Sequence, residues 1–150
     1  MDPDSRPGPA TAGIPDVIVA DRTWRRMVPR AEQIVRRAAA LGGGAGSVLL
    51  ASDAEVRRLN WQYRGKNKAT NVLTFDSGDI AVASGVVRRE ARAAGKTAAQ
   101  HLAHLVVHGA LHLRGHDHGG AGDARRMEMR ETWLLRRLGI PNPWRAGASP

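Results

Sequence analysis

The chain has 150 residues and a mass of 16.1 kDa, which suits one domain and is too short for two domains with separate cores. It contains no cysteine, which excludes disulfides, thiolate metal sites and cysteine nucleophiles. The 23 Lys and Arg residues exceed the 14 Asp and Glu residues, for a formal net charge of +9, and this balance favours a polyanionic partner.

Short apolar runs and turn residues predict four strands and five helices. The strands are expected at residues 16–20, 47–51, 71–75 and 79–83, and the helices at 29–41, 53–63, 85–94, 97–113 and 123–138. A tight connection at 76–78 joins the last two strands. This mixture predicts an α+β domain with one small sheet packed with helices.

The two ends of the chain are expected to be flexible around a single domain at residues 16–144. Residues 1–15 are rich in proline and small residues and form the expected leader, and residues 145–150 form the expected tail. The N-terminus lacks the basic start and apolar stretch of a secretory signal. Apolar runs also stay below the roughly 18 residues that a membrane span needs. We therefore expect a cytoplasmic protein with no membrane partner.

The most informative segment is the predicted helix that carries four of the six histidines. At about 100° per residue, these histidines share one face and the apolar side chains occupy the other. His108 and His112 are four residues apart, so their Cβ atoms are expected about 5–6 Å from each other. Gly115 can turn the chain out of the helix and bring His118 to the same place. Three imidazoles on one ion leave a fourth position for water, as in a catalytic zinc site.

The same His-x3-His spacing has other interpretations. Histidines on exposed helices are common, so the pair alone is weak support for a metal, and it is the third histidine after a glycine that indicates one. The spacing also occurs in zinc proteases, where a Glu follows the first histidine and acts as general base. Gly109 stands at that position here, which argues against a protease. Three imidazoles suit Ni, Cu or Fe as well as Zn.

Several blocks of the sequence resemble the YbeY family of bacterial endoribonucleases. They are HGALHLRGHDH (108–118), LNWQYRGKNKATNVLTF (59–75), GDIAVA (78–83) and MEMRE (127–131), and the similarity covers roughly residues 45–144. The resemblance implies a small α+β domain with a four-stranded mixed sheet and a metal cleft on the zincin-like histidine helix. It implies a single-strand-specific, metal-dependent RNase that matures ribosomal RNA, notably the 3′ end of 16S rRNA, and acts in ribosome quality control.

The resemblance also assigns residues to roles. His108, His112 and His118 match the family's metal ligands, which we expect to hold one Zn²⁺ per chain, and Arg64 matches its functional cleft arginine. The segment between Phe75 and the GDI block is shorter here than is usual in the family. This difference puts in doubt any substrate contact or lid role of that segment.

The basic loop after Arg64 is the predicted RNA contact. Arg64, Lys66 and Lys68 are expected to bind phosphate, because the planar guanidinium fork of Arg matches a phosphate group. Tyr63 could stack on an unpaired base, whereas Trp61 is expected in the core. A solvated turn is the alternative interpretation of the loop. The basic stretch at 22–37 could also follow RNA, but a solvated helix face explains it nearly as well, since 20 of the 23 basic residues are Arg.

Carboxylates near the histidines are candidates for orienting the metal ligands. Asp117 could accept a hydrogen bond from an imidazole or cap the turn. Glu128 and Glu131 share the apolar side of the last predicted helix, and a carboxylate in that position needs a partner, such as a ligand histidine or an Arg. His101 and His104 are expected to extend the histidine face toward the cleft as hydrogen-bonded wall residues.

These expectations combine into a zinc-dependent endoribonuclease. Zn²⁺ lowers the pKa of its bound water to about 7, and the resulting hydroxide could attack phosphorus or take the proton of the ribose 2′-OH. Arg64 would neutralise charge on the phosphoryl oxygens. Two alternatives remain open at this point: a metallohydrolase of another substrate class, and a non-catalytic, RNA-binding ribosome-assembly factor.

Overall fold

The computed structural model describes residues 14–115 and 121–140. The strands are β1 (Asp16–Val19), β2 (Ser47–Ala51), β3 (Val72–Thr74) and β4 (Ile80–Ala83). The helices are α2 (Thr23–Met27), α3 (Ala31–Leu41), α4 (Asp53–Arg64), α5 (Ser84–Ala93), α6 (Ala98–Leu113) and α7 (Ala121–Arg137). The predicted tail, and all but two residues of the predicted leader, lie outside the described residues.

The four strands form one mixed sheet in the order β1-β2-β4-β3. β1, β2 and β4 run parallel, with Val17 beside Val48 and Val48 beside Ile80. β3 pairs antiparallel with β4 through a short hairpin, in which the Phe75 N–H donates to the Asp79 carbonyl at 2.9 Å. The prediction of an α+β domain with a four-stranded mixed sheet is confirmed.

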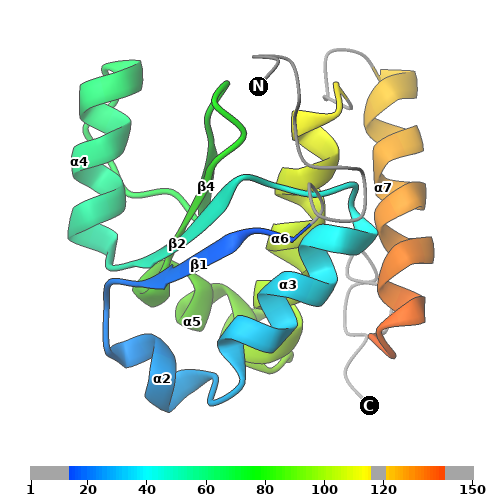
Figure 1. Ribbon diagram of the computed structural model, residues 1–150, viewed down its shortest axis with the longest axis horizontal. Helices are drawn as coiled ribbons and strands as arrows, with labels where there is room; N and C mark the ends of the chain where they lie inside the picture. Colours follow the sequence, from blue (N-terminus) through cyan, green and yellow to red (C-terminus); the bar gives the residue numbers. More distant parts are fainter. Residues whose placement is uncertain (1–13, 116–120, 141–150) are drawn as a thin grey trace, which may run out of the picture.

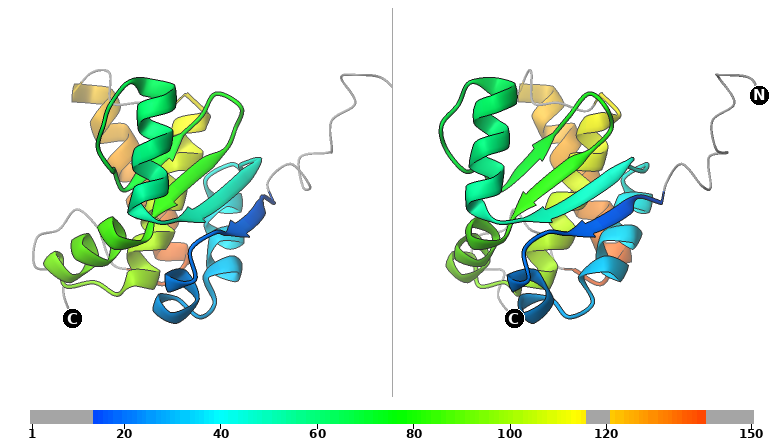
Figure 2. Two further views of the ribbon diagram at one scale, coloured as in Figure 1. Left: turned by 90° about the vertical axis from the view of Figure 1, so that its left-hand side faces the viewer. Right: turned by 60° about the vertical axis from the view of Figure 1, so that its left-hand side comes forward.

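Helices cover both faces of this sheet. Side chains alternate along each strand, so Leu50 and Val82 point into a core shared with α3 and α6. Ala51 and Ala83 point to the opposite face, into a smaller core shared with α4. α7 packs on the outside of α6, so that α4 and α7 stand on opposite sides of the molecule (Figures 1 and 2).

Helix α6 lies at the centre of the larger core, and its ends follow the sequence signals. Thr97 forms a capping box with Gln100, which satisfies N–H groups of the first turn. Gly115 ends the helix with a φ of +89°, the left-handed conformation that glycine adopts without strain. This helix meets α3, α5, α7 and strand β3. Its histidines contact α5 through His101 and Glu90, and α7 through His108 and Glu131.

Helix α2 was not predicted from the sequence. Its five residues include Trp24, whose side chain is fully buried and whose indole N–H donates to the Ala51 carbonyl at 2.9 Å. A helix this short is unstable alone, so its position depends on this contact with β2. Within the described residues, we find no helix with the length and apolar character needed to cross a membrane.

Candidate metal and RNA site

The histidine face of α6 runs from the interior of the protein to its surface. His101 and His104 are buried, His108 keeps about a quarter of its side chain exposed (25%), and His112 is exposed. Successive ring centroids are 5.7, 6.4 and 6.5 Å apart. His101 and His104 are covered by the neighbouring helices: His101 lies against Glu90 of α5, and His104 lies 4.0 Å from Glu131 of α7.

Glu131 on α7 contacts the middle of this histidine face. Its side chain is fully buried, and its Oε1 atom accepts a hydrogen bond from Nδ1–H of His108. Its Oε2 atom lies 4.0 Å from Nε2 of His104. A proton held on Nδ1 leaves the lone pair of Nε2 available, which is the tautomer that a metal ligand binding through Nε2 requires. The sequence placed both Glu128 and Glu131 as candidates for this contact, and the structure selects Glu131.

His108 and His112 are the two described histidines of the expected metal triad. Both carry the imidazole nitrogens that bind metal ions, and they lie one helical turn apart on α6. The rings of His108 and His112 stack nearly parallel, at 19°. Both nitrogens must come within about 2.0–2.1 Å of a zinc ion, so binding requires these rings to turn toward each other. Among residues 14–115 and 121–140, no group of three or more His, Asp or Glu side chains is placed to hold a metal. His118 and Asp117 lie outside the described residues.

His104 stays neutral in the folded protein. Burial is the largest cause, and together with the positive charges of His101, Lys96 and His108 it lowers the pKa of His104 from 6.5 to about 3. A neutral imidazole between His101 and His108 adds no positive charge to the site. His104 is therefore a neutral, buried packing residue near neutral pH.

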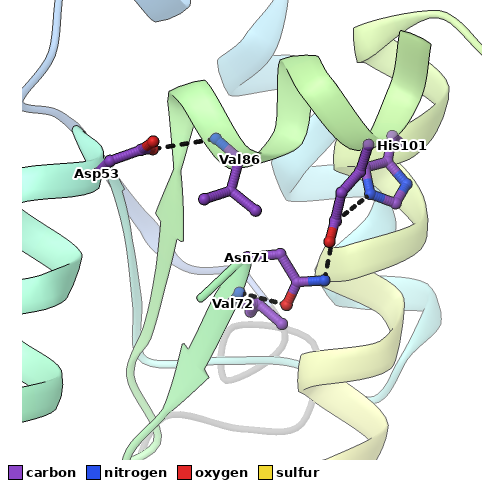
Figure 3. A network of polar contacts seen from close by, with 6 residues as sticks. Asp53, Asn71, Val72, Val86 and His101 are labelled. Carbon is purple, nitrogen blue, oxygen red and sulfur yellow. Dashed lines mark hydrogen bonds and ion pairs between the residues drawn. The ribbon is translucent and has the colours of Figure 1, made fainter. Parts of the chain in front are cut away.

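His101 links α6 to α5 and to the sheet. Its Nε2 lies 2.8 Å from Glu90 Oε1, which also accepts from Asn71 Nδ2 at 3.0 Å (Figure 3). Asn71 in turn fixes the start of β3, because its Oδ1 accepts from the Val72 N–H. The prediction that His101 is a hydrogen-bonded residue is confirmed by its contact with Glu90. Glu90 was not predicted from the sequence; its side chain is 43% exposed, so the helical pattern of α5 gives it no buried position that would require a partner.

Arg64 reaches the same end of the sheet from the opposite face. It is the last residue of α4, and its Nη2 donates to the Thr74 carbonyl at the end of β3, at 3.0 Å. Thr74 lies against α6, since a Cβ built on Gly109 would come within 3.3 Å of its Cγ2 and 3.1 Å from Ile80 Cδ1. Thr74 therefore stands between Arg64 and the residue that follows His108.

A hollow of about 650 Å³ opens beside Arg64 between α4 and the sheet. Its wall includes Tyr63 and Phe75, whose rings meet edge to face with centroids 5.4 Å apart. Asp79 lies at the hairpin end of the hollow, and the hydroxyls of Ser77 and Ser47 hold the pKa of its carboxyl below the usual value. The hollow thus offers apolar and aromatic surface next to one exposed guanidinium.

The basic loop is attached to α4 by Asn60. This side chain is 2% exposed, and its Nδ2 donates to the Lys68 carbonyl at 2.9 Å. Lys66 and Lys68 are exposed on this loop but do not line the hollow. Trp61 is 60% exposed, so its expected place in the core is wrong. Asn60 points inward, and the next residue lies about 100° further around the helix, away from the sheet.

The described structure is a small α+β domain with a mixed sheet. A buried carboxylate contacts one imidazole of α6, and an arginine lies at the end of β3. The family model described as Endoribonuclease YbeY matches residues 18–139. The chain belongs to the YbeY endoribonuclease family.

Individual relatives agree with this assignment. A Gluconobacter oxydans protein named Endoribonuclease YbeY is 49% identical over 98% of this chain and 94% of its own length. A protein of the same name from Bordetella pertussis is 49% identical over 72% of this chain and 74% of its own length. The solution structure of a Thermotoga maritima protein has the same fold, with a TM-score of 0.55 and 24% identity over 91% of this chain and all of that one.

Proposed function

We propose that this chain is a metal-dependent endoribonuclease that cleaves single-stranded RNA in ribosomal RNA processing, including maturation of the 3′ end of 16S rRNA, and in ribosome quality control. The names of its relatives support the reaction class. The observation that carries the proposal is the fully buried Glu131 on Nδ1 of His108. A buried carboxylate is costly unless it is paired, and here its partner is a histidine that the family resemblance matches to a metal ligand.

The metal site in this proposal consists of His108, His112 and His118 around one Zn²⁺. Glu131 holds His108 in the required tautomer, and Asp117 does the same for a neighbouring imidazole. When bound, the ion supplies the Lewis acidity that makes water reactive near neutral pH. His108 keeps a quarter of its side chain exposed (25%) and His112 is exposed, so RNA can reach this end of α6.

Arg64 binds the phosphate in this proposal. One guanidinium N–H group is used by the Thr74 carbonyl, and the remaining donors of the planar fork can reach phosphoryl oxygens and offset their developing charge. Lys66 and Lys68 hold neighbouring phosphates. Tyr63, which is 62% exposed next to the hollow, offers a stacking surface to an unpaired base. An unpaired base reaches such a surface more easily than a paired one, which accounts for single-strand selectivity.

The proposal places the protein in the cytoplasm, in association with the ribosome. A metallohydrolase of peptides would share the histidines but would not need a basic loop. A non-catalytic assembly factor would need the loop and no reactive metal. The test below separates these three functions.

The test compares the wild-type protein with the variants His112→Ala and Gln33→Ala on a labelled single-stranded RNA. Gln33 is an exposed residue of α3 and serves as the control. We expect His112→Ala to lose both the bound metal and RNA cleavage, while still binding RNA, and we expect the control to keep all three. Cleavage by a metal-free preparation of His112→Ala would overturn the proposal.

A further inference from the structure

The hollow beside Arg64 lies on the face of the sheet that α4 covers only in part. Figure 2 shows α4 on the β3–β4 side of the sheet and β1 at the far edge. Ile18 on β1 lines the hollow and is 51% exposed, so the hollow opens to solvent along the sheet. Its volume of about 650 Å³ is within the range of about 300–1,000 Å³ that is typical of small-molecule sites.

Asp79 presents a carboxylate to this hollow in a fixed position. Its Oδ1 accepts from the Ser47 hydroxyl at 2.8 Å, and its Oδ2 accepts from the Ser77 hydroxyl at 2.7 Å. The Ser77 hydrogen bond is the largest cause that holds the pKa of this carboxyl below its usual value, and the Ser47 hydrogen bond acts in the same direction. Asp79 is therefore ionised at neutral pH.

This carboxylate keeps capacity for further donors. A carboxylate has about four acceptor positions on its two oxygens, and the two hydroxyls use one on each. Among the residues that the structure describes, no Lys or Arg forms an ion pair with Asp79. An ionised group that lines a hollow without a cation is a strong acceptor for a ligand N–H.

The hairpin between β3 and β4 determines where this acceptor lies. The Phe75 N–H donates to the Asp79 carbonyl at 2.9 Å, and the Gly78 N–H donates to the Phe75 carbonyl at 2.8 Å. Gly78 has a φ of +95°, which glycine adopts without strain. This tight turn brings the Ser77 hydroxyl back to Asp79 and places the carboxylate on the same face of the sheet as the Phe75 ring.

Aromatic side chains form the wall between the hairpin and α4. Tyr63 is 62% exposed, and its ring meets that of Phe75 edge to face. Leu49 and Leu59 line the hollow and are half-buried. The hollow therefore combines apolar and aromatic surface with a polar group at its hairpin end. Such a site suits a flat ring that is apolar on its faces and polar at its edge.

The charges in the wall match a nucleotide better than they match a basic peptide. A phosphate can bind Arg64, whereas Asp76 and Asp79 repel a second phosphate from the hairpin end. A neutral base with N–H groups can approach the carboxylate without this repulsion. A basic peptide could pair with Asp79, but it would place a like charge beside Arg64. The observations therefore favour a base of RNA.

The chemistry of the base edges selects among the four bases. Guanine presents N1–H and its 2-amino group side by side, so that two donors meet the two oxygens of a carboxylate. Adenine and cytosine present an amino group next to an acceptor nitrogen, and uracil presents its N–H between two carbonyl oxygens. Each of these three edges brings an acceptor toward the carboxylate, which is unfavourable.

We infer that the hollow is a guanine subsite, in which Tyr63 and Phe75 contact the base and Asp79 accepts hydrogen bonds from its N1–H and 2-amino groups. The inference rests on the proposed function, in that the ligand is a nucleotide of the RNA substrate. Thr74 separates the hollow from α6, since its carbonyl binds Arg64 and its Cγ2 faces Gly109. The guanine thus lies next to the cleaved bond, at a fixed distance along the strand.

The test measures cleavage of uridine strands of about 12 nucleotides in which one purine is moved through every position. The purine is guanine, hypoxanthine (in inosine) or adenine, so stacking is matched and the polar edge changes. Inosine keeps N1–H and lacks the 2-amino group. The variant is Asp79→Asn, which keeps the size of the side chain. The control is Asp16→Asn, at an exposed position on β1 outside the hollow, with the same change in charge.

We expect the wild-type protein to prefer guanosine over adenosine by about tenfold or more in kcat/KM at one position relative to the cut, with inosine between them. Asp79→Asn should reduce this ratio to less than about twofold while it cleaves the adenosine strand at the wild-type rate. Asp16→Asn should keep the wild-type ratio. The comparison of guanosine with inosine needs no variant, so it tests the contact even if Asp79→Asn does not fold.

Two results would overturn the inference. Equal rates with all three purines at every position would assign Asp79 to another ligand, such as a basic peptide. A guanosine preference that persists in Asp79→Asn would assign the preference to another part of the protein.

Binding of the same strands to the metal-free protein, measured by fluorescence anisotropy, separates the two proposals. If the protein with metal cleaves none of the strands, the proposed function fails, and a guanosine preference in binding that Asp79→Asn abolishes still supports the subsite. If the protein cleaves the strands and shows no base preference, only the further inference fails.

Discussion

Glu131 on α7 and His108 on α6 are 23 residues apart in the chain, and the carboxylate of the first accepts a hydrogen bond from the imidazole of the second. The contact lies where Glu131 is fully buried and where the histidine face begins to open to solvent. This polar contact joins α7 to the candidate metal site, so docking of α7 on α6 determines the orientation of a predicted ligand.

Replacing Glu131 with Gln tests this contact. The amide can still accept from Nδ1–H, but it lacks the charge that raises the basicity of the imidazole, so we expect metal affinity to fall about 10- to 100-fold while the fold is kept. Chelator competition with metal analysis measures the change. Glu128→Gln, on the same helix, should bind metal as the wild type does. Equal affinities in the two variants would contradict the assigned role of Glu131.

Replacing Arg64 with Lys separates charge from geometry. Lys keeps the positive charge but lacks the planar fork, so it cannot serve the Thr74 carbonyl and a phosphate in the same way. We expect kcat/KM on single-stranded RNA to fall by about 10- to 100-fold with unchanged metal content. Arg58→Lys, at an exposed position on α4 paired with Glu55, is the control. If Arg64→Lys retains full activity, Arg64 contributes only long-range charge.

Gly109 occupies the position at which zinc proteases of this spacing carry their Glu general base. The packing around Gly109 leaves little room for a side chain there. A Cβ there meets Ile80 Cδ1 and Thr74 Cγ2 at 3.1 and 3.3 Å. Gly109→Ala should change the free energy of unfolding by less than about 1 kcal/mol, because a gain in helix propensity offsets a small shift of these neighbours. Gly109→Glu should cost about 3 kcal/mol or more, since it buries a carboxylate against apolar atoms. Urea unfolding measures both, and a Glu variant as stable as the Ala variant would contradict this packing.

The lowered pKa of His104 predicts a loss of stability in acid. In the unfolded chain this imidazole takes up a proton as the pH falls through 6.5, whereas in the folded protein it does so only near 3. The stabilisation is complete above pH 6.5 and declines as the pH falls from 6.5 toward 3, by up to about 1.4 kcal/mol per pH unit. The groups that face His104 in this range are Glu131, His101, Lys96 and His108.

Urea unfolding at pH 7.5 and 5.0, with chelator present, checks this prediction. His104→Gln cannot titrate, so its loss of stability between the two pH values should be smaller than that of the wild type by about 2 kcal/mol. Chelation removes any contribution from metal release, and comparing each protein with itself across pH removes the cost of the substitution. Identical losses in both proteins would contradict the neutral, buried state of His104.

Local signals predicted most of the elements. Ser52 accepts from the Glu55 N–H at the start of α4, and Thr97 forms the capping box of α6. Such caps act within three or four residues, so the sequence alone indicates where these helices begin. The start of α2 carries a weaker signal, and its stability comes from Trp24 reaching Ala51 on another element. The periodicity of the sequence cannot predict a contact between two separate elements.

The sequence predicted which residue types form the candidate site, but it did not predict which of these side chains are buried. The α-helical period correctly grouped four histidines on one face, but it could not indicate that the helices carrying Glu90 and Glu131 cover His101 and His104. Both Glu128 and Glu131 satisfied the pattern on α7, and the direction in which α7 packs decides between them. The ligand set of His108, His112 and His118 stays a prediction.

Every other described element precedes α7 in the chain. During translation, α6 and its histidines are therefore synthesised before the carboxylate that orients His108. Docking of α7 on α6 is therefore the step that fixes the orientation of His108, and it follows the synthesis of every other described element.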